Sequence, residues 1–393
     1  MQWLNRAMLR LPTENTLDRE EKIMAEWVER KIADIGTVVG GATPSTKKLE
    51  NYEDGEIAWI TPKDLSTFSS RYIERGERNI TEIGLKSCST QLLPPNTVLF
   101  SSRAPIGYVA IAANEVCTNQ GFKSVIPNEN TDPLFLFYLL KYNKDKIEGM
   151  GSGTTFKEVS GNTMKNILVN VPTDKKVQEK IAAILGSIDD KIEENERINN
   201  NLEQQAQAIY QQMFIGNRNA NWKEGKLSDL VAVKYGKDHK KLDDGCYPVY
   251  GSGGIMRYVE KPLYIGESVL IPRKGTLNNV MYVNGAFWSV DTMFYTEMLR
   301  PNIAKFVYHF VKGKDLASLN AGSAVPSMTT NILNAMQLYI PDDETLCIFE
   351  DAVTPMYAQM QENENQSVIL AKLRDTLLPK LISGELAVSD IDL

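Results

Sequence analysis

Cations and amides follow the apolar, strand-like runs of this chain, in positions that suit contact with nucleic acid. Arg103 comes shortly after residues 98–100, and Arg273 and Lys274 come shortly after residues 269–271. Strand ends lie at exposed edges, where Arg, Lys, Asn and Gln can bind base edges and where cations and hydroxyls can bind phosphates. Residues of these types at strand ends are therefore candidates for contact with nucleic acid.

The predicted contacts fall into two sets, one in each half of the chain. The first set is Lys63, Ser101, Ser102, Arg103, Asn119, Gln120, Lys123, Thr154 and Lys157. The second set is Lys237, His239, Tyr250, Ser252, Arg257, Arg273, Lys274, Asn278 and Asn279. A solvated surface position is the alternative for each of them, and residues 118–120 could form only a turn. Trp27 and Trp222 are instead expected to anchor the core where each domain begins.

The motifs of common catalytic sites are absent from the sequence. It contains no GxxxxGK[ST] nucleotide loop, no HExxH and no metal-spaced carboxylate set. Residues 93–96 resemble the Asn-Pro-Pro-aromatic run of an amino-methyltransferase only superficially. The glycine-rich stretches 149–155 and 250–254 could lie along a DNA backbone or form plain turns. The sequence predicts no catalysis and no metal in this chain.

Composition bounds the class of protein. The 393 residues suffice for two domains with full cores. The net charge of −7 is uneven: the acid lies on the predicted helices and the tail, and the globular parts are neutral to basic. No apolar run approaches the roughly 18 residues that span a bilayer, and the first ten residues lack a signal-peptide core. Four scattered cysteines fit reduced thiols, so we expect a cytoplasmic protein.

The chain repeats itself. The pattern that begins at Trp27 reappears at Trp222, 195 residues later, whereas Val98 aligns with Val269 at an offset of 171. Near the domain exits the offset is 169, and for the helices it is 168. The first domain therefore holds roughly two dozen extra residues before Val98, which we expect to form loops.

Short strands broken by Gly, Pro and Asn alternate with few helices inside each repeat. Residues 56–60 read as a strand, and two hairpins are predicted, 97–100 with 108–111 and 268–271 with 280–283. Helices are predicted at the equivalent positions 135–142 and 303–311. Each domain is therefore expected to be α+β.

A long helix follows each domain. Apolar residues at alternating spacings of three and four form a heptad seam, typical of a coiled coil. The seam residues are Ile181, Leu185, Ile188, Ile192, Asn195, Asn199, Leu202, Ile209, Met213, Phe349, Val353, Met360, Asn363, Ser367, Leu370, Leu377 and Leu381. Arg374 also falls on the seam, where Leu373 is expected to take its place. Pro355 should bend the second helix or delay its start.

Antiparallel pairing of these helices would give partners whose residue numbers sum to 562. Leu185 then meets Leu377, Met213 meets Phe349, and Asn199 meets Asn363 in a central polar layer. Such a layer fixes register at some cost in stability. The alternative is that each helix packs separately on its own domain.

The predicted organisation is linear along the chain. Residues 1–21 form an unassigned arm, which could be disordered or could contribute to a helix over residues 17–26. The remaining segments are a first domain, 22–172, a first helix, 173–216, a second domain, 217–341, a second helix, 342–386, and a tail, 387–393.

The sequence resembles the specificity subunit of a Type I restriction-modification enzyme over roughly residues 22–386. The resemblance is carried by the repeated Trp-x3-Lys-[Ile/Leu]-x-Asp-[Ile/Leu] starts, by the segments 59–65 and 247–255, by the Val-Pro and Ile-Pro exits, and above all by residues 373–386. It implies two target-recognition domains separated by antiparallel spacer helices. Each domain would read one half of an asymmetric, gapped DNA site.

The resemblance also implies partners and cofactors. Two modification subunits would dock on this chain and methylate adenine with S-adenosylmethionine, and restriction subunits would add ATP- and Mg²⁺-dependent cleavage. The chain itself would bind none of these cofactors. Two other classes stay open: a coiled-coil scaffold that reads no DNA, and a fused methyltransferase-specificity enzyme.

Overall fold

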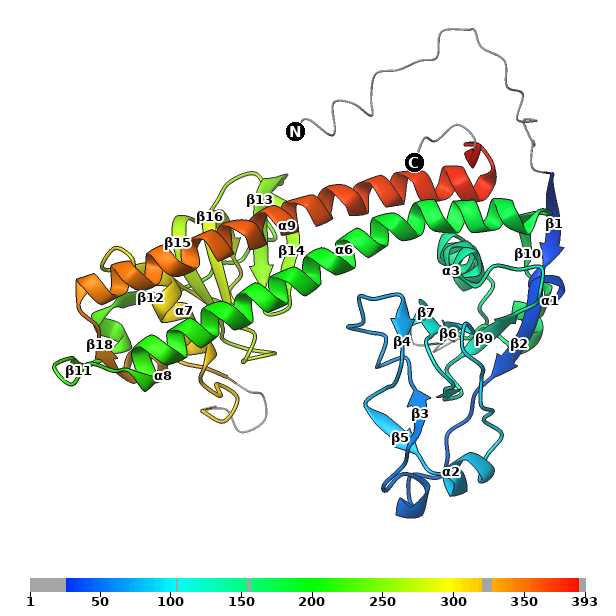
Figure 1. Ribbon diagram of the computed structural model, residues 1–393, viewed down its shortest axis with the longest axis horizontal. Coiled ribbons are helices and arrows are strands. Elements are labelled where there is room, and N and C mark those ends of the chain that lie inside the picture. Colours follow the sequence, from blue (N-terminus) through cyan, green and yellow to red (C-terminus); the bar gives the residue numbers. More distant parts are fainter. Residues whose placement is uncertain (1–25, 104, 154–156, 320–326, 389–393) are drawn as a thin grey trace, which may run out of the picture. The chain divides into compact units, whose positions relative to one another are not determined.

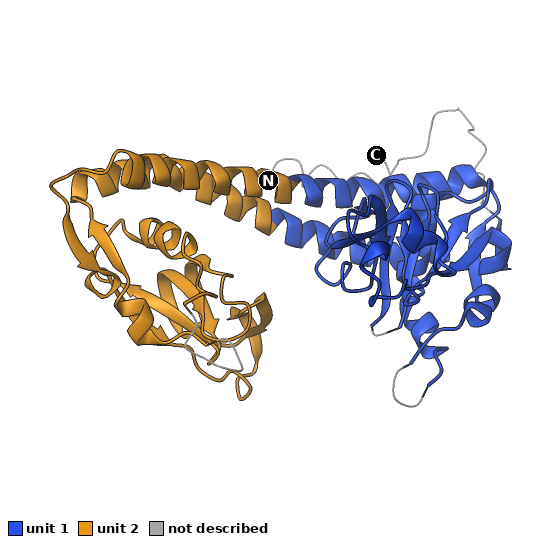
Figure 2. Ribbon diagram, turned by 90° about the horizontal axis from the view of Figure 1, so that it is seen from below, with its two compact units in different colours: residues 1–194, 366–393 blue, residues 195–365 orange. Residues whose placement is uncertain are grey.

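The protein consists of two α+β units, and each unit contains one half of a pair of long helices. The computed structural model describes residues 26–103, 105–153, 157–319 and 327–388 (Figure 1). One unit comprises residues 1–194 and 366–393, and the other comprises residues 195–365 (Figure 2). The division passes through both long helices, which the sequence analysis had set apart as segments of their own. The arm 1–21 lies outside the described residues.

Unit 1 contains a five-stranded sheet, a three-stranded sheet and a two-stranded ribbon. Their strand orders are β2-β9-β6-β7-β4, β5-β3-β8 and β1-β10. The strands are β1 Trp27–Lys31, β2 Gly36–Gly40, β3 Ile57–Ile60, β4 Tyr72–Ile73, β5 Arg78–Ile80, β6 Val98–Ser102, β7 Ile106–Ala112, β8 Cys117–Thr118, β9 Lys123–Pro127 and β10 Leu168–Pro172. The short helices are α1 Ile32–Ile35, η1 Leu49–Asn51, α2 Glu82–Lys86, α3 Pro133–Tyr142, α4 Lys144–Gly149 and α5 Gly161–Asn166.

Unit 2 contains one six-stranded sheet and a two-stranded ribbon. Their orders are β12-β17-β15-β16-β13-β14 and β11-β18. The strands are β11 Lys223–Lys226, β12 Val231–Tyr235, β13 Asp244–Gly251, β14 Gly254–Val259, β15 Tyr264–Pro272, β16 Met281–Ser289, β17 Met293–Met298 and β18 Gln337–Ile340. The short helices are η3 Leu227–Asp229, α7 Ala304–Lys312 and α8 Thr330–Asn334.

Both predicted hairpins and both predicted domain helices are confirmed. Strand β6 pairs antiparallel with β7, and β15 pairs antiparallel with β16. Helices α3 and α7 occupy the two predicted helical segments, and their apolar side chains are buried against the sheets. The strands that enter and leave each unit pair with each other, so that Trp27 lies opposite Pro172 and Lys223 lies opposite Ile340.

The two long helices are α6, Lys175–Tyr210, and α9, Asp343–Ser383. The first one ends in a π-helical turn, η2, over Gln211–Gly216. Pro355 lies inside α9, so the prediction that it delays the start of the helix is wrong. Pro355 and Asp351, the residue whose carbonyl loses its helical donor, are both on the exposed face, where water can replace the missing hydrogen bond.

Contacts between the helices occur within each unit. In unit 2, Asn363 Nδ2 donates to Asn199 Oδ1 at 2.7 Å, and Asn199 Nδ2 donates to the Met360 carbonyl at 3.1 Å. Asn195 Nδ2 donates to the Asn363 carbonyl at 3.3 Å. Partner numbers fall along α9 as they rise along α6, so these segments run antiparallel, and Asn199 and Asn363 are the pair whose numbers sum to 562. All seam residues are buried or half-buried.

Arg374 is the exception to the predicted seam. Leu373 is 46% exposed and does not replace it. In unit 1 the Arg374 guanidinium instead faces α6 and donates to Asp189 Oδ1 at 2.7 Å. The other carboxylate oxygen, Asp189 Oδ2, accepts a 2.6 Å hydrogen bond from the Tyr138 hydroxyl of α3. A polar pair therefore joins α3 to both long helices, where the heptad pattern predicted an apolar contact.

Candidate nucleic-acid interface

The ends of four strands meet at one edge of each unit, which we call the loop rim. It contains residues 41–43, 61–64, 102–103 and 119–121 in unit 1 and residues 236–239, 251–254, 273–279 and 289–292 in unit 2. The same backbone hydrogen bonds close both rims. In unit 1 they are Ala42 N to Thr118 O (3.0 Å), Asn119 N to Ile60 O (3.0 Å) and Ser102 N to Gly121 O (2.7 Å). In unit 2 the equivalents are, in the same order, Lys237 N to Ser289 O (2.8 Å), Val290 N to Tyr250 O (3.1 Å) and Arg273 N to Thr292 O (2.9 Å).

These equivalent bonds map the sequence repeat onto the fold. Their partners follow the predicted offsets, 195 near the start of each unit and 171 beyond β6 and β15. A parallel strand pair gives a third offset. Ile60 lies opposite Thr118 just as Tyr250 lies opposite Ser289, and Tyr250 comes 190 residues after Ile60. Nineteen of the extra residues of unit 1 therefore lie between Ile60 and Val98.

Glycine is required where the rim segments cross. A Cβ atom on Gly41 would lie 2.2 Å from both the Thr118 and the Asn119 carbonyl oxygens, and a Cβ atom on Gly236 would lie 2.0 Å from the Val290 carbonyl oxygen. A buried indole supports the residue after each glycine. Trp59 Nε1 donates to the Ala42 carbonyl at 3.2 Å, and Trp288 Nε1 donates to the Lys237 carbonyl at 2.8 Å.

In unit 2 the structure brings several predicted contact residues together on the loop rim. Asn279 Nδ2 donates to the Ser252 carbonyl at 2.8 Å and ties two rim segments to each other. Arg273 Nη1 donates weakly to the Asp291 carbonyl at 3.4 Å. Among the described residues, Lys237 and Lys274 have no carboxylate within ion-pair distance, and both are exposed. This rim therefore presents cations that are free to bind an anionic partner.

Tyr235 borders the loop rim of unit 2 and is absent from the predicted contacts. It is 51% exposed at the end of β12, and the Arg273 guanidinium lies over its ring, 5.3 Å from the centroid. An exposed aromatic ring beside an arginine can stack on a base or a sugar. The sequence could have indicated this residue, because an aromatic residue ends a strand-like run directly before Gly236.

The remaining predicted residues of unit 2 have other roles or partners. Arg257 is paired with Asp244 Oδ1 at 2.7 Å. Asn278 binds Asp315 and the backbone of Ala317, so it closes a loop. Tyr250 is half-buried, and burial raises the pKa of its hydroxyl to about 12. The Nδ1 atom of His239 is buried and has no hydrogen-bond partner among the described residues.

In unit 1 the predicted hydroxyls are not available to DNA. Ser101 and Ser102 are fully buried. The Ser101 hydroxyl donates to the Pro105 carbonyl and accepts from the Tyr108 amide, both at 2.8 Å, because the β6–β7 turn folds back over it. The Ser102 hydroxyl donates to the Gly121 carbonyl at 3.1 Å. The prediction that these two side chains contact DNA is wrong.

Acidic neighbours engage several cations of unit 1. Glu158 lies 3.9 Å from Arg103 and 3.4 Å from Lys123, and Glu77 lies 2.7 Å from Lys63. Such partners weaken phosphate binding unless DNA displaces them. Among the described residues, the cations of the unit 1 rim are therefore paired with carboxylates, whereas Lys237 and Lys274 of the unit 2 rim are not.

The other predicted residues of unit 1 differ in how exposed and how engaged they are. Asn119 Oδ1 accepts from the Gly121 amide at 2.8 Å, which supports the turn interpretation of this segment. Gln120 and Lys157 are exposed, and Gln120 binds the Thr43 hydroxyl. Thr154 lies outside the described residues.

Comparison with known proteins identifies the family. A family model of the Type I restriction modification DNA specificity domain matches residues 24–204 and again residues 219–369. The chain belongs to this family. The two matches follow the repeat that the paired loop rims display.

Relatives match over nearly the full length. The specificity subunit of the Type I restriction enzyme MjaIX from Methanocaldococcus jannaschii is 31% identical, over 94% of this chain and 96% of that protein. The EcoprrI specificity subunit from Escherichia coli is 22% identical, over 82% and 86%. The crystal structure of a Type I restriction-modification S subunit from M. genitalium has the same fold, with a TM-score of 0.58 and 17% identity over 93% of this chain and 98% of that one.

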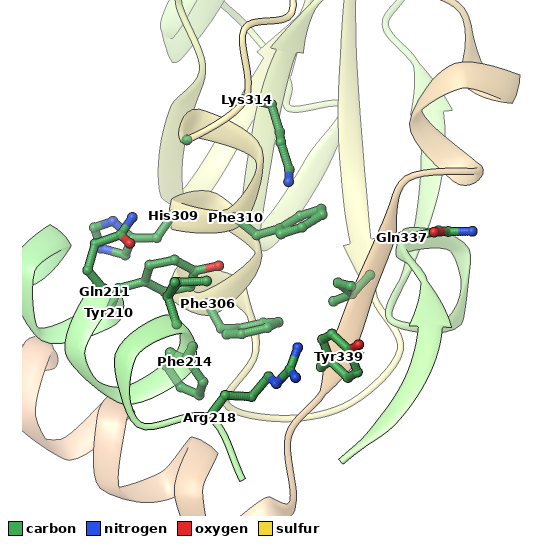
Figure 3. A pocket seen from close by; sticks show the side chains of 13 residues that line it. Tyr210, Gln211, Phe214, Arg218, Phe306, His309, Phe310, Lys314, Gln337 and Tyr339 are labelled. Atoms are coloured by element: carbon green, nitrogen blue, oxygen red, sulfur yellow. The ribbon is translucent and has the colours of Figure 1, made fainter. Parts of the chain in front are cut away.

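Unit 2 also contains a cavity of about 330 Å³ beside α7 (Figure 3). Aromatic side chains line it, including Phe214, Phe310 and Tyr339. The Arg218 guanidinium lies 3.7 Å from the Tyr339 ring centroid, and Lys314 Nζ lies 4.6 Å from the Phe310 centroid. Among the described residues neither cation has a carboxylate within ion-pair distance, so the cavity suits an acidic group with an apolar neighbour.

Unit 1 has a cavity of about 310 Å³ at the equivalent position. Phe214, Phe310 and Leu338 of the unit 2 cavity correspond, through the offsets of 168 to 171, to Ile382, Leu139 and Val169, which line the unit 1 cavity. Each cavity lies where the C-terminal end of a long helix meets the strand ribbon.

Among the described residues no helix is long and apolar enough to cross a bilayer.

Proposed function

We propose that this chain is the sequence-specific DNA-binding subunit of a Type I restriction-modification enzyme and performs no catalysis itself. Each unit reads one half of an asymmetric, bipartite and gapped site through its loop rim. The observation that carries the proposal is the duplicated rim, which has equivalent backbone bonds but different exposed side chains. Equivalent frames with different side chains suit two different half-sites.

The long helices are proposed to form an antiparallel coiled coil that sets the distance between the half-sites. The Asn199–Asn363 hydrogen bond supports a defined register, because buried amides at seam positions tolerate few alternative pairings. The apolar layers support it as well. Leu185 and Leu377 belong to one core, and Met213 and Phe349 belong to another.

Two modification subunits are proposed to dock on the chain, together with restriction subunits, in the cytoplasm. The two equivalent cavities support a pair of identical partners, because an internal repeat can offer the same surface twice. S-adenosylmethionine would bind in the modification subunits, and ATP and Mg²⁺ in the restriction subunits. The relatives named above are specificity subunits, in accord with a division of labour between reading and chemistry.

A map of methylated adenines in the host genome tests the proposal. A gapped, two-part motif should be methylated in cells that contain this chain and unmethylated after its deletion. Restoring the gene should restore the same motif. An unchanged methylation map would remove the proposal, and a partner complex that assembles but binds no gapped duplex would favour the scaffold function instead.

A further inference from the structure

Arg71 lies in the segment of unit 1 that has no counterpart in unit 2. This segment, residues 61–77, runs between β3 and β5 and adds β4 to the edge of the sheet, parallel to β7. The corresponding strands of unit 2, β13 and β14, are separated only by residues 252–253. The Arg71 carbonyl accepts from the Ile111 amide at 2.8 Å, so its backbone belongs to the sheet. Its side chain is only 7% exposed and turns away from the sheet toward α6.

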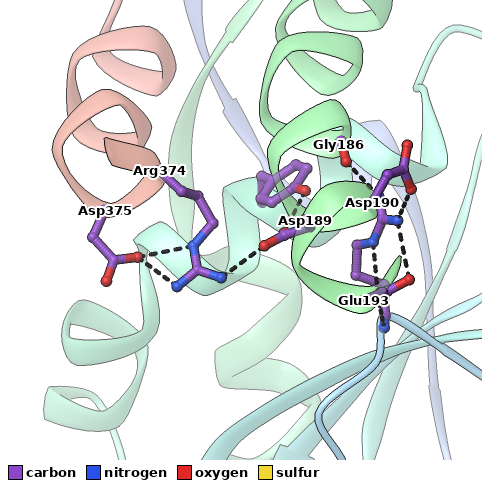
Figure 4. Close-up of polar contacts among 8 residues, drawn as sticks. Gly186, Asp189, Asp190, Glu193, Arg374 and Asp375 are labelled. Carbon is purple, nitrogen blue, oxygen red and sulfur yellow. Dashed lines mark hydrogen bonds and ion pairs between the residues drawn. The ribbon is translucent and has the colours of Figure 1, made fainter. Parts of the chain in front are cut away.

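The guanidinium of Arg71 is held by two turns of α6. Its partners Gly186, Asp190 and Glu193 are labelled in Figure 4. Nη1 donates to the Gly186 carbonyl at 3.3 Å, and Nε donates to Glu193 Oε1 at 3.2 Å. Nη2 donates to Glu193 Oε2 at 3.4 Å and is ion-paired with Asp190. The backbone amide of Arg71 also donates to Glu193 Oε1, at 3.1 Å. Because these hydrogen bonds are directional, they fix the orientation of the sheet on α6 as well as its distance from the helix.

The helix is shaped to receive this side chain. Gly186 lies in the interior of α6, where glycine costs roughly 0.5–1 kcal/mol relative to alanine. A Cβ atom at this position would lie 3.2 Å from Arg71 Nη1 and 3.1 Å from Leu134 Cδ2. The glycine is therefore explained by the close approach of Arg71 and α3. Thr354 occupies the equivalent position of α9, 168 residues later, where no such arginine arrives.

Apolar packing around this joint is incomplete. A cavity of about 210 Å³ lies beside Arg71 and is lined by the inserted segment, by β7, by α3 and by both long helices. Close packing there cannot by itself prevent the sheet from rocking against the helix. The Arg71–Glu193 pair is largely shielded from solvent, whereas the Asp190 carboxylate is 69% exposed. Such pairs add little net stability, but they define geometry. The contacts of Arg71 therefore fix the angle between the sheet and α6.

We propose that Arg71 is a positioning residue that fixes the first recognition domain on α6 and so limits the number of base pairs tolerated between the two half-sites. The inference rests on the proposed function, because it requires that the chain read a gapped duplex. A domain free to rock on its helix reaches half-sites over a wider range of separations. Arg71 touches no DNA in this role; it acts through the angle of the domain.

Competition binding with the assembled complex of this chain and its modification subunits tests the proposal. The probes are duplexes that carry the same two half-sites at the natural spacing, one base pair shorter or one base pair longer. Arg71→Gln and Gly186→Ala perturb the joint from its two sides. Both should bind the natural duplex nearly as well as the parent chain. Their preference for it over the altered spacings should fall by about fivefold or more, or about 1 kcal/mol.

Arg75→Gln is the matched control, because Arg75 is an exposed arginine of the same inserted segment. Its spacing preference should equal that of the parent chain, even if its affinity falls for all duplexes. An unchanged preference in folded Arg71→Gln or Gly186→Ala overturns the proposal. If Arg71→Gln does not fold, Arg71→Lys and Gly186→Ala decide by the same criterion. A parent complex that binds no gapped duplex refutes the proposed function instead.

Discussion

At the level of single residues, the loop rims depend on backbone contacts that only glycine allows. A Cβ atom on Gly236 would overlap the Val290 carbonyl, and both segments are fixed by strands, so neither can move away at low cost. Gly236→Ala should therefore lower the free energy of unfolding by about 1–3 kcal/mol. Urea unfolding followed by circular dichroism measures this decrease. Gly253→Ala in the same rim is the control, since its Cβ would meet no atom within 4 Å; equal decreases in both variants would contradict the argument.

The free cations of the unit 2 rim lead to a prediction for DNA binding. Arg273→Gln combined with Lys274→Gln should weaken binding of the gapped duplex at all salt concentrations. It should also reduce the slope of log affinity against log salt by about 1 for each phosphate that the variant no longer binds. Lys261→Gln removes a lysine beyond the opposite end of β14 and should leave the slope unchanged. Titrations at several salt concentrations give both quantities; a parental slope in the double variant would exclude Arg273 and Lys274 as phosphate contacts.

Residue types predicted the location of the candidate site but not the state of each side chain. Arg273 and Lys274 are on the rim because they end a strand, and strand ends follow from sequence pattern. Ser101 is the residue before the last one of the equivalent strand β6, yet its hydroxyl is hydrogen-bonded to the Pro105 carbonyl and the Tyr108 amide. Arg257 is likewise engaged by Asp244. Such partners are fixed by how turns close and strands pair, which hydrophobic periodicity does not encode.

At the level of helices, the paired asparagines of α6 and α9 can be tested together and singly. Asn363→Leu leaves the amide of Asn199 without its main partner in a half-buried layer and should destabilise the chain by about 1–3 kcal/mol. Asn199→Leu with Asn363→Leu replaces both partners and should raise the melting temperature above that of either single variant. The double variant should loosen the register, which cysteine cross-linking across the helices would detect. A double variant less stable than both singles would contradict this reasoning.

Helix α7 is attached to both long helices through a neutral histidine. The Nδ1 atom of His309 lies 2.7 Å from Gln207 Oε1 on α6, and Nε2 lies 3.0 Å from the Tyr357 hydroxyl on α9. This joint is equivalent to the contact between Tyr138 and Asp189 in unit 1, at offsets of 171 and 168. Burial lowers the pKa of His309 to about 4, and Glu203 only partly opposes this effect.

The lowered pKa of His309 predicts a pH dependence of stability. The unfolded chain takes up a proton near pH 6.5 and the folded chain near pH 4, so the free energy of unfolding should fall as the pH drops from 6.5 to 4. The decline attributable to one proton is about 1.4 kcal/mol per pH unit. His309→Gln should flatten this part of the profile, whereas His239→Gln at the loop rim should retain it. Urea unfolding at several pH values measures both, and an unflattened profile in His309→Gln would assign the effect to other groups.

The periodicity of the helices was sufficient to predict that two long helices exist and that Asn199 and Asn363 pair. It was insufficient at Arg374 and Gly186, because both positions respond to a third element. Arg374 pairs with Asp189, which α3 also binds, and Gly186 makes room for Arg71 from the inserted segment. A heptad pattern describes contact between two helices only. Positions that a domain also touches therefore depart from it.

At the level of the whole molecule, the repeat separates what is shared from what differs. The shared features are the closing bonds of the rims, the glycines at positions 41 and 236, and the cavities at the helix ends. The inserted segment and the ion pairing of the rim cations differ. These differences lie where bases would be read and where the first domain meets α6. On the proposed function, a duplicated frame with two unlike rims suits an asymmetric site.

The helices then predict how the natural spacing could be changed. Four residues inserted after residue 194 of α6 and four after residue 365 of α9 keep the polar and apolar layers within each unit intact. At 3.6 residues per turn this insertion rotates one half of the pair by about 40° relative to the other. One base pair rotates a duplex by about 34°, so the preferred spacing should increase by about one base pair while both half-sites stay the same.

Methylation mapping of cells that carry the lengthened chain identifies the new motif directly. The same insertion in α6 alone should abolish methylation, because it breaks the pairing of the helices. An unchanged spacing in the doubly lengthened chain would show that the helices do not measure the gap.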